Sequence, residues 1–241
     1  MDPSAAVLSD LAPTGKLRAA INFGNPVLAA RSPVAGEAGG ISADLARELA
    51  RHLGVPIAFV PYEQAGDVVK GLRSGAWDVC FLAIDPVRGA DISFTLPYVV
   101  IEGVYLVADA SAVREPADVD SEGIRVGVIV GSAYDLFLTR ELKRASLVRL
   151  AGPEAVLAAL VAGTVEVVGG VKPALEADAR RVPGLRMVPG AFMAINQAMG
   201  TPRGRDAGAA YLREFVAAMK ASGFVATAFT RNRIEGASLA P

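Results

Sequence analysis

Short apolar runs rich in β-forming residues alternate with segments of helical periodicity, and this alternation restricts the fold more than any other feature. The first series predicts three strands, at residues 16–21, 56–61 and 77–84. It predicts helices at residues 43–53, with Ser42 as N-cap and Gly54 as stop, and at residues 65–73. Such an order is typical of an α/β fold, in which helices cover a parallel sheet.

A second series follows a long apolar stretch at residues 98–107. Its predicted strands lie at residues 124–130, 147–150, 165–168 and 186–188. Its predicted helices lie at residues 131–144, 153–162 and 172–181. The chain then returns through an apolar run, two helices and a tail expected to fray, at residues 192–199, 205–222, 224–230 and 236–241. We therefore predict two lobes: residues 1–107 with 194–241, and the inserted residues 108–193.

Charge and composition exclude several classes of function. The 241 residues carry 24 basic and 25 acidic side chains, so there is no electrostatic footprint for nucleic acid. No apolar run approaches the 18 residues of a transmembrane helix, and we expect no membrane insertion. With only Cys80 and His52, a disulfide or cysteine zinc site is excluded, and we expect neither metal nor cofactor. The first residues, MDPSAAVLSDLAPTGKL, do not form a secretory signal as written.

Six segments occur in a familiar order. They read GKLRAAINFGNP, GGISADLARELARHLGV, VVKGLRSGAWDV, IDPVRGADISFTLPY, VGVIVGSAYDLFL and VLAALVAGTVEVV. Together they resemble the motifs of ABC-transporter solute-binding proteins, in the group that serves polar amino acids. The resemblance spans about residues 16–232 and implies the type II periplasmic-binding-protein fold. In that fold two Rossmann-like lobes are joined by two crossover strands, and a ligand cleft between them closes by hinge motion.

The resemblance also implies partners and a compartment. A small carboxylate-bearing ligand is the expected partner, with transporter permease subunits if the protein is exported. The family leads us to expect a monomer in the periplasm. A cytoplasmic location is the alternative, because the chain as written shows no export signal.

Arg88 is the leading candidate for ligand contact. It follows a predicted buried strand, and the family's matching arginine holds the ligand carboxylate with its planar guanidinium. The alternative is a surface arginine paired with Asp85 or Asp91. Asp85 stands near a position where the family has Ser or Thr, and an aspartate there either contacts a ligand donor or orients Arg88.

Gly131 and Ser132 lie where a strand meets a helix. Backbone N–H groups at such a junction favour an anion, and the resemblance implies that they hold the same carboxylate. The alternative is that Ser132 is simply an N-cap. Tyr134 is a further candidate for this site.

Five other candidates are less specific. Phe23 stands where the family stacks an aromatic ring on its ligand, with Asn22 and Asn25 beside it. Glu102 lies alone in an apolar run, either as a desolvated acid or as a strand residue facing solvent. Gln197 lies on the returning crossover, as a pocket or hinge residue.

Val171 marks a departure from the family. Its α-amino-acid binders have at about this position an aspartate that pairs with the ligand ammonium. An ammonium buried without a counter-charge is costly. We therefore expect a ligand that is not a standard α-amino acid.

Two other functions remain as alternatives to solute binding. Some relatives with this fold are dehydratases that act on small carboxylates, and Glu102 or Asp85 would supply the general acid here. A stand-alone sensor is the other alternative.

Overall fold

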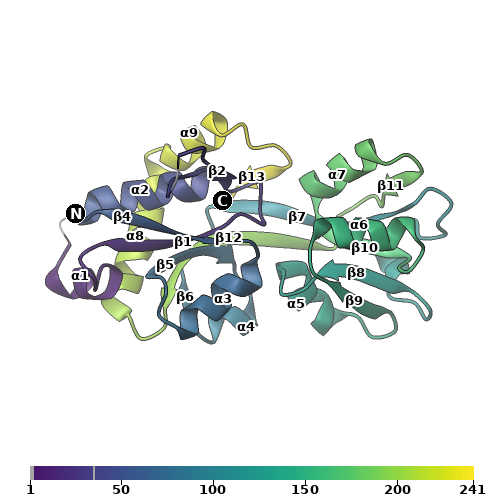
Figure 1. The fold of residues 1–241 in the computed structure, drawn as a ribbon, viewed down its shortest axis with the longest axis horizontal. Coiled ribbons are helices and arrows are strands. Elements are labelled where there is room, and N and C mark those ends of the chain that lie inside the picture. The colour runs from purple at the N-terminus through teal and green to yellow at the C-terminus, as the bar shows by residue number, and fades with distance from the viewer. Residues whose placement is uncertain (1–2, 35) are drawn as a thin grey trace. The chain divides into compact units, whose positions relative to one another are not determined.

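The computed structural model describes residues 3–34 and 36–241. It divides into two compact units: unit 1 contains Met1–Val100 and Asn196–Pro241, and unit 2 contains Ile101–Ile195. The boundaries fall inside the long strands β7 (Val99–Ala108) and β12 (Met193–Pro202), which belong to both units (Figure 1). The boundary expected at residue 107 lies near the other end of β7, whereas the one expected at residue 194 lies at the same end of β12 as the observed boundary.

The sheet of unit 1 is built around β1 (Leu17–Asn22). It is parallel to β4 (Ile57–Tyr62) on one side and to β5 (Val79–Ala83) on the other. All five residues of β5 are buried, as expected of a central strand. Beyond β5 the sheet continues with β12, which runs antiparallel and also pairs with the short β6 (Ile92–Phe94).

Helices cover both faces of this sheet (Figure 1). On one face lies α2 (Ile41–Leu53), and on the other lies α3 (Ala65–Arg73). Beneath α3 a core of buried side chains surrounds Trp77, whose indole N–H donates to the carbonyl of Val68 at 2.8 Å. The remaining helices of unit 1 are α1 (Ala5–Leu11), α4 (Pro86–Gly89), α8 (Asp206–Ala221) and α9 (Phe224–Arg231).

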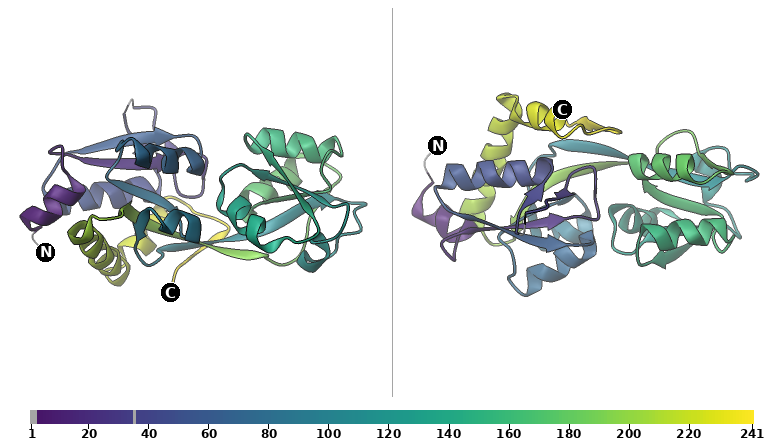
Figure 2. Two further views of the ribbon diagram at one scale, coloured as in Figure 1. Left: turned by 90° about the horizontal axis from the view of Figure 1, so that it is seen from below. Right: turned by 45° about the horizontal axis from the view of Figure 1, so that its top comes forward.

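Helix α1 was not predicted from the sequence; it packs against α8, as both views of Figure 2 show. The Asp10 carboxylate accepts the N–H of Gly208 at 2.9 Å, and Arg205 donates to the Asp10 carbonyl. A Cβ at position 208 would lie 2.8 Å from the Leu11 side chain. Glycine at this position therefore allows the two helices to approach closely.

Unit 2 repeats the parallel pattern. Its central strand β8 (Arg125–Ile129) is parallel to β9 (Ser146–Leu150) and to β10 (Val167–Val171). β10 then pairs antiparallel with β7, and β7 with β11 (Leu185–Met187). A 3₁₀ turn, η1 (Pro116–Val119), precedes β8.

The helices of unit 2 also lie on two faces. A Cβ at Gly169 would touch Leu138 of α5 (Ala133–Glu141), whereas one at Gly170 would touch Leu175 of α7 (Lys172–Arg181). Successive strand residues point to opposite faces, so α5 and α7 lie on opposite sides. Leu175 shares its core with three residues of α6 (Pro153–Val161), namely Val156, Leu157 and Leu160, so α6 covers the same face as α7 (Figure 1).

Both units contain the same arginine–acid clamp at the start of the central strand. In unit 1 the backbone N–H and the guanidinium of Arg18 bind Asp78, and a further guanidinium N–H binds the Gly75 carbonyl. In unit 2 Arg125 binds Glu166 and the Gly163 carbonyl in the same way. Each acid ends a Leu-x-x-Gly-x-x-acid step in the sequence.

Two predictions about element ends were wrong. Ser42 does not cap α2, whose N-cap is Gly40; instead Ser42 is buried, and its hydroxyl lies 3.4 Å from that of Tyr98. The tail expected to fray contains β13 (Ala237–Leu239), which pairs with β7, and the N–H of Ala240 donates to the Tyr98 carbonyl. The left-handed stop at Gly54 is confirmed by its φ of 67°.

Candidate functional site

The parallel strands β1, β4 and β5 bring their carboxyl ends to one edge of the unit 1 sheet. Ligands in open α/β sheets bind outside such an edge. We call the loops that follow these strands, residues 23–25, 63 and 84–88, the unit 1 edge. It holds Phe23 after β1, Glu63 after β4, and Asp85 and Arg88 after β5.

Arg88 is held by the turn that follows β5. Asp85 is the N-cap of α4, and its Oδ1 accepts the N–H of Val87 at 2.8 Å. The Arg88 side chain points back, so that Nη1 donates to the Ala83 carbonyl at 3.1 Å. Both residues are buried, with exposed fractions of 4 % for Asp85 and 3 % for Arg88.

The position of Arg88 has electrostatic consequences. Burial lowers the pKa of Arg88 below its ordinary value, and the charge of Asp85 opposes that shift. Arg88 is therefore not the surface arginine of the alternative interpretation, although Asp85 does act on its charge. A guanidinium held in this way is fixed in direction before any ligand arrives.

The loop after β1 is shaped by its own polar groups. The Asn22 side chain accepts the N–H of Gly24 at 3.0 Å, and the N–H of Phe23 donates to the Tyr62 carbonyl. A Cβ at Gly24 would clash with the Glu63 carbonyl. The Asn25 carbonyl accepts two N–H groups farther along the loop. The Asn22 side chain thus has a structural role that does not require a ligand. The contacts of Asn25 involve its backbone, and its side-chain Oδ1 is buried without a hydrogen-bond partner among the described residues.

Phe23 is only partly buried, and one face of its ring is occupied by another side chain. The guanidinium carbon of Arg31 lies 4.6 Å from the ring centroid. Arg31 belongs to a small hairpin formed by β2 (Ala30–Arg31) and β3 (Ala38–Gly39), and it also pairs with Glu63. Arg31 was not predicted from the sequence, because only the hairpin brings it over the ring.

Gln197 lies close to the Arg88 anchor. It is buried, and its register partner in β5 is Ala83, whose carbonyl receives Arg88. Its own carbonyl accepts the N–H of Tyr98 at 2.9 Å. The structure therefore brings Gln197, Asp85 and Arg88 together around the end of β5.

In unit 2 the corresponding positions follow β8 and β10. We call residues 130–135 and 171–172 the unit 2 edge. Gly131 has a φ of 72°, a left-handed conformation that glycine adopts readily, and Ser132 is the N-cap of α5. Ser132 Oγ accepts the N–H of Asp135 at 3.0 Å, so its capping role is observed.

The Gly131 N–H is not free for an anion. It donates to Asp135 Oδ2 at 2.8 Å, while Oδ1 of the same carboxylate accepts from Arg149 at 2.9 Å. The chain thus supplies its own carboxylate at the Gly131 N–H, and the ligand role of Gly131 stays a prediction. A ligand anion at this helix end would use N–H groups farther into the first turn.

Tyr134 is buried beside this helix end, with 7 % of its surface exposed. Burial raises the pKa of Tyr134 to about 12, and a hydrogen bond with Ser132 opposes the shift. The phenol therefore stays protonated at neutral pH. The structure thus brings Gly131, Ser132 and Tyr134 together in unit 2.

Glu102 is not a desolvated acid. Its side chain is 51 % exposed and pairs with Lys172 Nζ at 2.5 Å. Hydrogen bonding to Glu102 raises the pKa of Lys172. Glu102 is thus the solvent-facing strand residue of the alternative interpretation. Lys172 was not predicted as a site residue from the sequence, although it directly follows Val171.

Apolar side chains are exposed beside these polar groups. In unit 1 they include Ile84, directly after β5, and Val87 of α4, with exposed fractions of 42 % and 59 %. In unit 2 Val130, directly after β8, is 45 % exposed. Both edges therefore offer apolar as well as polar contacts.

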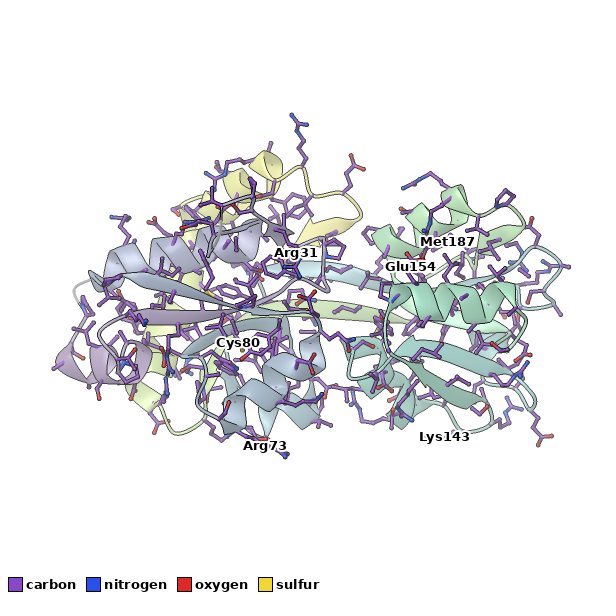
Figure 3. All side chains as sticks on the ribbon, viewed as in Figure 1. Arg31, Arg73, Cys80, Lys143, Glu154 and Met187 are labelled. Atoms are coloured by element: carbon purple, nitrogen blue, oxygen red, sulfur yellow. The ribbon has the colours of Figure 1, made fainter. Side chains whose placement is uncertain are left out.

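Three further features of the described residues concern metal binding, membrane spans and the single cysteine. Residues 3–34 and 36–241 contain no group of three or more histidine, cysteine or acidic residues placed to hold a metal ion. None of the helices described is long and apolar enough to cross a membrane. Cys80, labelled in Figure 3, is buried in β5.

Several solved structures of amino-acid-binding proteins share this fold. A mutant of ArgBP from T. maritima is 19 % identical, with a TM-score of 0.77, and the match covers 95 % of this chain and 100 % of that one. The ancestral amino acid-binding protein AncCDT-1, a precursor of cyclohexadienyl dehydratase, is 20 % identical over 94 % and 99 % of the two chains, with a TM-score of 0.76. AbpA from Streptococcus pneumoniae, bound to L-arginine, is 21 % identical over 93 % and 98 %, with a TM-score of 0.75.

These likenesses confirm the predicted type II periplasmic-binding-protein fold. A search of curated protein sequences finds no match. The family model of the bacterial extracellular solute-binding proteins, family 3, matches residues 17–231, which leaves only the chain's two ends outside. The chain therefore belongs to the bacterial extracellular solute-binding proteins, family 3.

Proposed function

We propose that this protein is the solute-binding component of an ABC transporter and that its solute is a small carboxylate other than a standard α-amino acid. Membership of family 3 supports the general role. Closure of the two units on the solute and a monomeric state stay predictions from the resemblance. So does a location outside the cytoplasm, which agrees with the family's description as extracellular.

Buried Arg88 is the observation that carries the carboxylate assignment. It is a charged group at the end of a central strand, held in direction by the Ala83 carbonyl and favoured in its charged form by Asp85. Hydrogen bonds from a guanidinium to a carboxylate are charge-assisted and contribute about 1.5–3 kcal/mol. A carboxylate that reaches Arg88 would also offset the cost of burying its charge.

The charges at the unit 2 edge argue against an α-ammonium. Val171 offers no counter-charge, and the next residue, Lys172, is a cation that would repel an ammonium. Two acids lie in this region, but Lys172 already pairs with Glu102 at 2.5 Å, and Arg149 with Asp135 at 2.9 Å. In this respect we expect the protein to differ from relatives such as AbpA, which was solved with L-arginine bound.

Isothermal titration calorimetry on the wild-type protein tests the proposal directly. Solutes released from protein purified from its expression host, identified by native mass spectrometry, supply the first ligands. Each carboxylic acid is then compared with its own methyl amide and with its α-amino derivative. We expect the amide to lose at least about tenfold in affinity, because it cannot accept a bidentate guanidinium.

The variant Arg88→Met tests the same assignment from the protein side. We expect it to lose about 100-fold or more in affinity for the acid. Circular dichroism and the melting temperature establish whether the variant folds, and the acid–amide comparison on wild-type protein stands even if it does not. Equal binding of acid and amide, or tightest binding of the α-amino derivative, contradicts the proposal.

Turnover is not part of the proposed function. The dehydratase alternative needs a desolvated general acid. Glu102 is exposed and paired. Asp85 is buried, but its carboxylate already accepts the N–H of Val87 as the N-cap of α4. Proton NMR of the bound solute over several hours tests this point. Spectral change that requires active protein would favour the enzyme.

A further inference from the structure

Arg31 occupies the face of the one aromatic ring that the unit 1 edge presents. Phe23 directly follows β1, and its N–H is tied to the Tyr62 carbonyl. The Arg31 guanidinium lies 4.6 Å from the ring centroid, in the geometry of a cation–π contact. A solute that stacked on this face would first have to displace Arg31.

The hairpin that carries Arg31 is held to the unit 1 edge by a second contact. Arg31 Nη2 donates to Glu63, the residue that directly follows β4. Both side chains remain in water, with exposed fractions of 59 % for Arg31 and 71 % for Glu63 (Arg31 is labelled in Figure 3). Pairs as exposed as this one are held weakly, so Arg31 can exchange Glu63 for another anion.

We propose that Arg31 is a specificity-determining residue of the solute site: it keeps cationic groups off Phe23 and binds a second anionic group on the solute. This inference rests on the proposed function, because it assumes that the first carboxylate is recognised by Arg88. The solute class is then a small dicarboxylate, or a monocarboxylate with another anionic group. Its apolar chain would lie against side chains such as Ile84 and Val87.

The charges around Arg31 favour an anion over a cation. The solute's second carboxylate gains hydrogen bonds from an exposed guanidinium whose present partner, Glu63, can turn to water. A cationic group at the same place would face Arg31 and would have to break the stack on Phe23. Selection thus combines an attractive contact for the anion with a repulsive one for the cation.

The test uses three series of probes of equal length: diacids from succinate to adipate, the monoacids from butanoate to hexanoate, and the matching ω-amino acids. Affinities are measured by calorimetry at low and at physiological salt. For the wild-type protein we expect the best diacid to bind at least about tenfold more tightly than its monoacid, and the ω-amino acid to bind most weakly. Added salt should weaken the diacid more than the monoacid.

Substitutions then test which side chain gives the diacid its higher affinity. Arg31→Ala should remove the advantage of the diacid, whereas Arg31→Lys should keep part of it. Glu63→Gln should tighten diacid binding several-fold, because it removes the competing carboxylate. Arg51→Ala is the matched control: Arg51 is an arginine of α2, 68 % exposed and paired with Glu48, and its loss should leave all three series unchanged.

The outcomes separate this inference from the proposed function. If no member of any series binds, or if acid and amide bind equally, recognition of a carboxylate fails and the role of Arg31 fails with it. If monoacids bind as tightly as diacids and Arg31→Ala changes neither, the role of Arg31 is overturned while the proposed function stands. A gain of ω-amino acid binding in Arg31→Ala, at the expense of diacids, supports both halves of the inference.

Discussion

The two units use the same arginine–acid clamp in different surroundings. Arg18 with Asp78 and Arg125 with Glu166 make the same set of hydrogen bonds, down to the glycine carbonyl that each arginine also reaches. Asp78, however, is fully buried, whereas the side chain of Glu166 is 35 % exposed. A local sequence step can therefore fix a hydrogen-bond pattern without fixing how much that pattern contributes to stability.

The difference extends beyond the clamps. Asp78 also binds Arg205 at 3.0 Å, which links β1 and β5 to the start of α8. At the edges, unit 1 buries its cation, Arg88, whereas unit 2 leaves Lys172 38 % exposed. At these positions the charged groups of unit 1 are buried and preoriented, whereas those of unit 2 remain near water.

The largest expected effect compares the two clamps directly. Asp78→Ala leaves two arginines without their shared buried partner, so we expect a loss of about 3–5 kcal/mol in the free energy of unfolding. Glu166→Ala, its matched control, should cost no more than about 1 kcal/mol, because that pair is partly exposed. Urea unfolding followed by circular dichroism measures both losses. Similar losses in the two variants would mean that burial of the acid does not determine how much each clamp stabilises the protein.

A second prediction concerns a carboxylate introduced at the end of β10, where the wild-type protein has Val171. Val171→Asp combined with Lys172→Ala places a carboxylate at the end of β10 and removes the adjacent cation. We expect affinity for L-α-amino acids to rise about tenfold relative to the acids without the amine. Calorimetry on Lys172→Ala alone is the control. An unchanged ratio would show that the ammonium of such ligands lies elsewhere.

Tyr134 is a titratable group of unit 2 that is buried. It therefore departs from the contrast between buried groups in unit 1 and exposed groups in unit 2. Its pKa is raised to about 12 in the folded state, so its protonated form stabilises the fold below pH 10, and that contribution is lost as the pH rises towards 12. We expect the wild-type protein to lose about 1 kcal/mol more than Tyr134→Phe between pH 9 and pH 11. Unfolding curves at the two pH values measure this difference; parallel losses would contradict it.

The smallest expected effect concerns the exposed ion pair of unit 2. Glu102→Gln should change the free energy of unfolding by less than about 1 kcal/mol, because both partners are near water. Affinity for the carboxylate should change by no more than about threefold. A larger change in affinity with unchanged stability would give Lys172 a direct role in binding.

The sequence predicted those parts of the fold that depend on local pattern. The bounds of α3 and α7 were predicted to the residue, because turn-forming or capping residues delimit their periodicity. The start of α2 was misplaced because Ser42, a residue typical of caps, is instead buried against Tyr98. The strand β13 was missed because it depends on pairing with β7, which lies far away in the sequence.

The candidate site was less predictable than the fold. The order of strands indicates that Arg88 follows β5, but its burial depends on how α4 turns the side chain back to Ala83. The contact of Arg31 with Phe23 depends on a hairpin, and that of Lys172 with Glu102 joins residues far apart in the chain. Such contacts arise from tertiary structure, and no local pattern encodes them.

The discontinuity of unit 1 has a consequence for synthesis. Unit 2 is one continuous segment and has all its residues once Ile195 has emerged from the ribosome. Unit 1 still lacks the rest of β12 and the helix α8 against which α1 packs, so its core cannot close until the last part of the chain arrives. Non-local closure of this kind is slow. We therefore expect nascent chains to protect unit 2 from proteolysis first, although unit 1 begins and ends the sequence.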